Sequence, residues 1–328
     1  LLSPFNFQYF PLSTSISVLE QIYSCFFSSR LQYIVNQRFL LAIVAVLLAM
    51  VTIQSGASFA KQLFPIVGPE GTSALRAFFA ALVLTIIFRP WRARLSAKGW
   101  RNVIFYGACL GAMNIIFYFA IERIPLGIGV ALEFTGPLAV AFFSARKKRD
   151  FAWAILAVAG VCLLLPDIGG ASAESLDPVG VILALTAGAF WAGYIVFGNK
   201  TGNEGSGGVT VTLGMLVAAI CVVPIGVASQ GIALLSPQAI FIGFAVGVFS
   251  SAIPYTLEMS AMRNMPKQTF SIMMSVEPAV AAIAAFIIID ETLTLSQWFA
   301  VALVVIATAG SSATQKQLPK QKQIETLS

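Results

Sequence analysis

Long runs of apolar residues, separated by short polar breaks, follow one another from about residue 40 to residue 312. A helix that crosses about 30 Å of hydrocarbon needs about 20 residues, and ten of the runs approach that length. Proline, glycine and charged residues mark the breaks, as at Arg89-Pro90. The pattern therefore predicts an all-α membrane protein with ten transmembrane helices. The predicted spans are 40–60, 73–88, 103–121, 127–144, 151–165, 179–198, 209–228, 239–259, 269–289 and 295–312.

The composition agrees with a membrane protein and narrows the chemistry. Only 10% of the residues are charged, against about 25% in a soluble domain. The chain has no histidine, which removes the usual general base and the usual zinc ligand. Its four cysteines form no C-x-x-C pair. We therefore predict no cofactor, no metal centre and no enzymatic activity.

The basic residues predict the orientation of the chain. With the N-terminus inside the cell, 17 of the 20 Lys and Arg residues fall in cytoplasmic segments, as the positive-inside rule requires. The net charge of +6 then reflects cytoplasmic loops and not nucleic-acid binding. We expect a multi-pass protein of the bacterial inner membrane with both termini in the cytoplasm.

The first 36 residues fit the pattern of spans poorly. They contain no Met, and the first Met of the sequence, Met50, lies inside the first predicted span. The moderately apolar stretch 10–27 lacks the basic start of a signal peptide. We expect an extended or alternative start, and residues 1–38 are assigned no function.

The two halves of the chain show a moderate internal similarity when the sequence is shifted by 141 residues. Pro125 then meets Pro266, and Pro137 meets Pro278. The ten spans divide into five and five, and an odd number of spans per repeat inverts the second repeat. Inverted repeats are a transporter architecture with the substrate site near the membrane midplane. The predicted repeats and the cytoplasmic tail are 39–166, 178–313 and 314–328.

Two glutamates lie where a membrane helix should be apolar. Glu133 and Glu277 fall near the middle of the fourth and ninth spans, and a carboxylate at the bilayer centre costs roughly 2.5–3.5 kcal/mol. Each lies beside a predicted kink proline, Pro137 or Pro278. A helical proline leaves the backbone carbonyl four residues back without its hydrogen bond. That carbonyl oxygen and the glutamate side chain would then lie at the same depth in the membrane, where they could bind an ammonium group or a proton. A kinked helix with a structural Glu–Arg pair is the alternative.

The remaining candidates are polar residues in or next to the spans. Glu258 follows a third kink proline, Pro254, in the eighth span, where it either binds ligand or pairs at the interface. Arg76 and Lys61 are the cations nearest the apolar region on the outside. Either could hold a substrate carboxylate, pair with a glutamate or extend to the membrane surface. Polar residues within spans, taken singly, more often join helices than bind ligand. Those kept as candidates are Gln54, Asn114, Trp191 and Tyr255.

Five stretches of the sequence resemble a known family. They are IQSGASFAK at 53–61, TSALR at 72–76, VALEFTGPLAV at 130–140, IPYTLEM at 253–259 and MSVEPA at 274–279. Together they resemble the inner-membrane threonine/homoserine exporters of the drug/metabolite transporter superfamily, whose halves are EamA-type repeats. The likeness extends from about residue 40 to residue 312, and EFTGPLAV is its most specific part.

This resemblance implies a ten-helix fold of two inverted five-helix repeats. It also implies export of threonine, homoserine and similar amino acids, driven by the proton gradient. Glu133, Glu258, Glu277, Arg76 and Lys61 lie in the matching stretches, and their individual roles are a physical inference.

The predicted substrate is a zwitterion that is carried by alternating access. Its ammonium would meet Glu133 or Glu277, and its carboxylate would meet Arg76 in the outward-facing state. Because desolvation favours a neutral acid, a proton and the ammonium would compete for one carboxylate, and this competition gives antiport. The expected partners are therefore the amino acid, protons and the lipid bilayer.

Three other functions are alternatives that the sequence favours less. A carrier of another small metabolite or a drug is the nearest. A passive channel would favour rings of like charge. An integral membrane enzyme would need a nucleophile–base pair, metal ligands or a phosphate clamp. The sequence leaves the oligomeric state open, a homodimer included.

Overall fold

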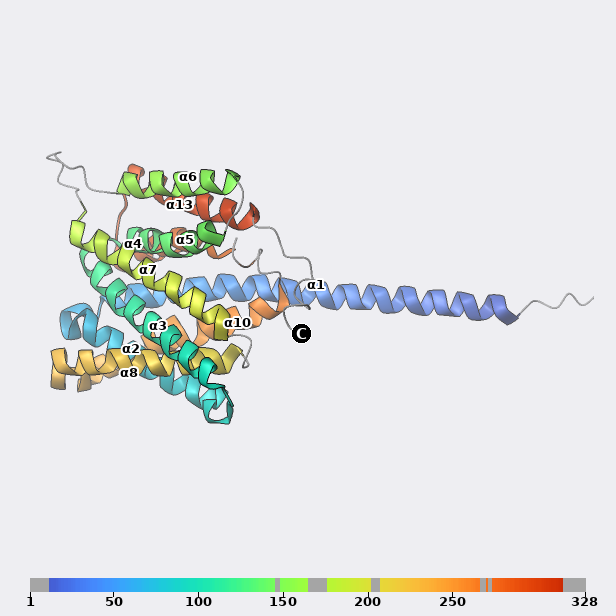
Figure 1. Ribbon diagram of the computed structural model, residues 1–328, viewed down its shortest axis with the longest axis horizontal. Coiled ribbons are helices and arrows are strands. Elements are labelled where there is room, and N and C mark those ends of the chain that lie inside the picture. Colours follow the sequence, from blue (N-terminus) through green and yellow to red (C-terminus); the bar gives the residue numbers. More distant parts are fainter. Residues whose placement is uncertain are drawn as a thin grey trace, which may run out of the picture.

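The computed structural model describes residues 12–144, 148–164, 176–201, 207–265, 270 and 273–314. Every regular element among them is helical, and the helices gather in one bundle (Figure 1). The α-helices are α1 (Leu12–Lys61), α2 (Phe64–Phe88), α3 (Ala97–Arg123), α4 (Leu126–Glu133), α5 (Thr135–Ser144), α6 (Lys148–Leu164), α7 (Pro178–Thr201), α8 (Gly207–Gln230), α9 (Pro237–Gly247), α10 (Ile253–Asn264), α12 (Glu277–Ile289) and α13 (Leu295–Thr314). Short helical turns are η1 (Pro90–Arg92), η2 (Gly231–Leu235) and the π-type turn η3 (Val248–Ala252).

Six of the described helical segments are long and apolar enough to cross a membrane. This finding confirms a multi-pass helical membrane protein. Helices also lie in the other four predicted ranges, but they are shorter or less apolar, so a count of ten spans stays a prediction. The six segments are Gln37–Lys61, Phe64–Phe88, Ala97–Arg123, Pro178–Gly198, Gly207–Leu235 and Pro237–Glu258.

Helix α1 is far longer than the first predicted span. It has 50 residues, and its N-terminal part projects from the bundle (Figure 1). Inside the bundle α1 has an exposed apolar stripe, whereas its opposite face is buried. A stripe of this kind is what a helix at the lipid boundary presents. The stripe includes Leu40, Val44, Leu47 and Val51, and the buried face includes Ala42, Val46, Ala49 and Met50.

Helix α2 begins nine residues before the predicted second span, at Phe64 instead of Ser73. The break predicted between the first two spans is present as a kink within α2, because Gly68 has φ 63° and ψ 173°. A positive φ is accessible to glycine at little cost. Since Pro65 stands in the first turn, where proline is tolerated, it does not stop the helix.

The core joins the two halves of the chain. One buried cluster combines Ala57 of α1 and Tyr118 of α3 with Ala281 of α12 and Val304 of α13. Since these helices come from both predicted repeats, polar side chains on their inner faces are brought together between the halves.

Two glycines allow a very close approach of α5 and α7. A Cβ atom on Gly136 would lie 1.9 Å from the backbone oxygen of Gly188, and one on Gly188 would lie 2.7 Å from the backbone oxygen of Glu133. Because neither neighbour is a flexible side chain, the helices would have to separate. This contact therefore fixes the position of Glu133.

We expect Gly136→Val to destabilise the bundle, because overpacking costs about 1–3 kcal/mol. The temperature at which half of the detergent-solubilised protein stays monodisperse should fall by about 5 °C. Ala228→Val is the control, since Ala228 is exposed on α8. Equal thermal stability of the two variants would contradict the close contact.

Candidate functional site

Three helix interruptions lie close to the candidate acids. Helix α4 ends at Glu133, and α5 begins two residues later. Helix α12 begins at Glu277, with Pro278 in its first turn. Pro254 likewise stands in the first turn of α10, directly after η3. Pro137 lies in the first turn of α5. All three prolines therefore follow an interruption of the helix, at a position that proline tolerates.

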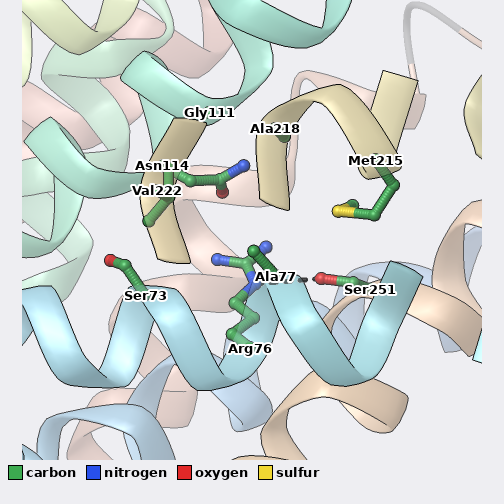
Figure 2. Close-up of a pocket in the computed structure, with 9 residues that line it drawn as sticks. All are labelled: Ser73, Arg76, Ala77, Gly111, Asn114, Met215, Ala218, Val222 and Ser251. Carbon is green, nitrogen blue, oxygen red and sulfur yellow. Dashed lines mark hydrogen bonds between the residues drawn. The ribbon is translucent and has the colours of Figure 1, made fainter. Parts of the chain in front are cut away.

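Arg76 is a buried cation with neutral partners. Its Nε donates to Ser251 Oγ at 2.9 Å, Nη1 donates to Tyr118 Oη at 3.2 Å, and Nη2 donates to the Ser250 carbonyl at 3.3 Å. Figure 2 shows the guanidinium reaching from α2 into the space beneath α3 and α8. Among the described residues, no carboxylate accepts a hydrogen bond from it. An unpaired buried charge is costly, so this cation is suited to receive an anionic group.

Glu277 and Gln54 form the second part of the site. Gln54 Nε2 on α1 donates to Glu277 Oε1 at 2.8 Å. The other oxygens of the two side chains, Gln54 Oε1 and Glu277 Oε2, are buried and have no donor within the described part of the chain. Buried acceptors without a donor are unfavourable. The pair can therefore accept hydrogen bonds from an ammonium group, and Glu277 can instead carry a proton.

Glu133 lies between these two parts. It is only 7% exposed, and it interacts electrostatically with both Glu277 and Arg76. The structure thus brings together three of the predicted site residues, from α2, α4 and α12. A buried cation and two buried acids in one cluster can hold a dipolar ligand.

Asn114 and Trp191 border this cluster. Asn114 Nδ2 donates to the Leu110 carbonyl at 2.8 Å, and the side chain lines a small cavity beside Arg76 (Figure 2). Trp191 packs edge-on against Phe134, with ring centroids 4.8 Å apart. Trp191 therefore contacts the residue that follows Glu133, and its role here is packing.

Lys61 is separated from the cluster by an ion pair of its own. Its Nζ pairs with Glu291 Oε1, and Glu291 Oε2 accepts a hydrogen bond from the backbone N–H of Leu126 at 2.7 Å. The end of α1, the start of α4 and the segment after α12 are joined in this way. The structure thus gives Lys61 a glutamate partner, which is one of the roles that the sequence left open.

A second ion pair lies at the ends of α3 and α7. Arg123 Nη1 is 3.1 Å from Asp177 Oδ2, and the backbone N–H of Val179 donates to Asp177 Oδ1 at 2.8 Å. The Val179 N–H, followed by Arg123, holds the pKa of the Asp177 carboxyl below its ordinary value. Asp177 therefore stays ionised at neutral pH and keeps this pair intact.

Glu258 and Tyr255 on α10 lie beside two further tyrosines, and Tyr255 also interacts electrostatically with Arg76 and Glu133. The rings of Tyr106 on α3 and Tyr194 on α7 stack with their centroids 4.7 Å apart, and both side chains interact electrostatically with Glu258. Sequence reasoning missed Tyr106, since nothing in its apolar run marks it. Glu258 also interacts with Glu277, so this group adjoins the central cluster.

Comparison with known proteins decides the family. The model of the EamA-like transporter family matches residues 178–313. The chain is 47% identical over 285 residues to the threonine/homoserine exporter RhtA of Salmonella typhimurium (strain SL1344), which covers 87% of this chain and 96% of the relative. RhtA of Escherichia coli (strain K12) matches with the same identity and coverage. The chain belongs to the EamA-like transporter family.

Members of this family that match the chain are transporters and not enzymes. A solved crystal structure shares the fold, with a TM-score of 0.58 and 17% identity, over 84% of this chain and 96% of that one. The family assignment thus agrees with a buried charged cluster inside a bundle of apolar helices.

We expect Glu291→Gln to loosen the junction at Lys61, because a neutral amide keeps the Leu126 contact but loses the ion pair. A cysteine introduced at the buried Ala60, in a background without the native cysteines, reports access to this region. Its labelling by a membrane-impermeant maleimide in intact cells should become about fivefold faster, for a loss of about 1 kcal/mol. Glu122→Gln, at an exposed glutamate near the same end, should leave the rate unchanged. An equal rate with and without Glu291→Gln would rule out the junction as a barrier.

Proposed function

We propose that this protein is an inner-membrane exporter of threonine, homoserine and related small amino acids. The observation that carries the proposal is the charge arrangement of the cluster. Among the described residues, buried Arg76 donates hydrogen bonds to neutral groups, and Glu133 interacts electrostatically with both Arg76 and Glu277. An amino acid is a zwitterion, so it supplies the anion that Arg76 lacks and the donor that Glu277 lacks. The names of the relatives, threonine/homoserine exporters, support this substrate class.

The proposed architecture has ten transmembrane helices in two inverted repeats, with both termini in the cytoplasm. The family model supports the division, because its match at 178–313 coincides with the second predicted repeat. In this orientation the Lys61–Glu291 pair lies at the extracellular end and the group of Tyr106, Tyr194 and Glu258 lies toward the cytoplasm. The proposed location is the bacterial inner membrane.

Transport then proceeds by alternating access. The Lys61–Glu291 junction closes the extracellular end while a substrate enters past the tyrosines. The ammonium binds at Glu277 Oε2 and Gln54 Oε1, which have no other donor, and the carboxylate binds at Arg76. Opening of the junction releases the substrate outside.

Proton coupling arises at the same carboxylate. Glu277 can bind either a proton or the substrate ammonium. Both would use the same carboxylate oxygen, Oε2, which has no donor among the described residues. Arrival of a proton from outside would displace the ammonium, and release of that proton inside would restore the site. Antiport therefore requires no second binding site.

We expect cells that express the chain to export labelled threonine and homoserine above an empty-vector control. Glu277→Gln and Arg76→Gln should each lower the export rate at least about tenfold, since loss of one charged partner of a buried pair typically costs 2 kcal/mol or more. Glu122→Gln serves as the control with an unchanged rate. Normal export by both site variants, with membrane levels equal to wild type, would refute the site.

We expect export to collapse when a protonophore removes the proton gradient. In inside-out vesicles, threonine uptake by the wild-type protein should carry protons out of the lumen and so raise the luminal pH. This rise should be smaller or absent in Glu277→Gln, because the amide cannot exchange a proton. A pH-sensitive dye trapped in the vesicle measures the proton flux. Threonine transport with no proton flux in wild type would show a uniporter and contradict antiport.

A further inference from the structure

A small cavity lies beside Arg76, the residue proposed to bind the substrate carboxylate. It lies between α2, α3 and α8 (Figure 2). It has room for about one water molecule. Polar side chains line one part of it, and small or apolar side chains line the rest. The lining residues are Ser73, Arg76, Ala77, Gly111, Asn114, Met215, Ala218, Val222 and Ser251.

The hydroxyl of Ser73 has no partner although it is buried. Ser73 is 2% exposed, and its Oγ has no hydrogen-bond partner among the residues that the structure describes. The adjacent Thr72 behaves in the ordinary way, because its Oγ1 donates to the Gly68 carbonyl four residues back at 2.7 Å. Ser58 and Thr212 do the same within their own helices. A buried hydroxyl without a partner is unfavourable, so Ser73 has the capacity to bind a group in the cavity.

Asn114 supplies the complementary group. Its amide nitrogen is tied to the Leu110 carbonyl at 2.8 Å, which fixes the orientation of the side chain. Figure 2 shows this amide across the cavity from Ser73 and Arg76. The cavity thus offers a hydroxyl and an amide, which together can donate to and accept from one small polar group. A hydroxyl is such a group, since it donates one hydrogen bond and accepts others.

The walls limit the size of the occupant. A Cβ atom on Gly111 would lie 3.1 Å from Ala218 Cα and 3.2 Å from a Val222 methyl group. Ser73 precedes Arg76 by three residues on α2 and so lies on the same helix face. If one ligand places a polar group at Ser73 and its carboxylate at Arg76, only a few bonds can separate the two groups.

We propose that Ser73 and Asn114 bind the side-chain hydroxyl of the substrate and so select short hydroxylated amino acids. This inference rests on the proposed function and specifies its substrate class. Threonine and homoserine both carry a hydroxyl close to the carboxylate, whereas valine has the shape of threonine with a methyl group in its place. Selection arises because valine leaves Ser73 and Asn114 without partners in a buried site.

Inside-out vesicles that accumulate labelled threonine test this inference, with unlabelled threonine and valine as competitors. Wild type should be inhibited by threonine at a much lower concentration than by valine. Ser73→Ala should reduce this preference about tenfold, and Asn114→Leu, of similar volume, should change it in the same direction. Thr72→Ala is the matched control, because that hydroxyl is satisfied within its own helix.

The outcomes separate the inference from the function on which it rests. If wild type prefers threonine and both Ser73→Ala and Asn114→Leu keep that preference, the hydroxyl site is overturned while threonine transport stands. If wild type accumulates neither threonine nor homoserine, the proposed function is refuted, and the inference that rests on it is refuted as well. A loss of preference in Thr72→Ala equal to that in Ser73→Ala would also overturn the inference, because it would show a general packing effect.

Discussion

A guanidinium or a carboxylate that leaves water for the interior of an apolar helix bundle loses solvation worth several kcal/mol, and only a partner group can restore it. This constraint governs the centre of the molecule. Arg76 recovers part of the loss from Ser251, Tyr118 and a backbone carbonyl, and Glu277 recovers part from Gln54. The two do not neutralise each other directly. A tight Arg–Glu pair would leave nothing for a ligand to complete, whereas this arrangement leaves both an anion site and a cation site in the cluster.

The two ends of the cluster differ in chemistry. At one end, Lys61 and Glu291 join α1, α4 and the segment after α12 through opposite charges. At the other, Tyr106 and Tyr194 stack as neutral rings beside Glu258. The Lys61 and Glu291 side chains are 17% and 19% exposed, so water that reaches them on opening can offset part of the cost of separating the two charges. A carrier that opens its two ends in turn needs such separable junctions on either side of a fixed site.

Much of the fold was predictable, because span length and apolar runs are local properties of the sequence. The convergence of Glu133, Glu277 and Arg76 was also predictable, since an ionised residue in a span points inward. The hydrogen-bond and ion-pair partners of the site residues were not predictable. Gln54 and Glu277 are 223 residues apart, and Lys61 and Glu291 are 230 apart, so only the packing of the two halves reveals these contacts. The hydroxyl of Ser73, which has no partner among the described residues, depends on one rotamer, and no periodicity records it.

The central claim is that one buried cluster holds both charges of an amino acid. A structure of the purified protein determined in the presence of threonine tests it most directly. The account predicts a threonine whose ammonium lies within hydrogen-bond distance of Glu277 Oε2 and Gln54 Oε1 and whose carboxylate contacts the guanidinium of Arg76. A threonine bound away from Arg76, with the hydrogen bonds of Arg76 to Ser251 and Tyr118 unchanged, would contradict it.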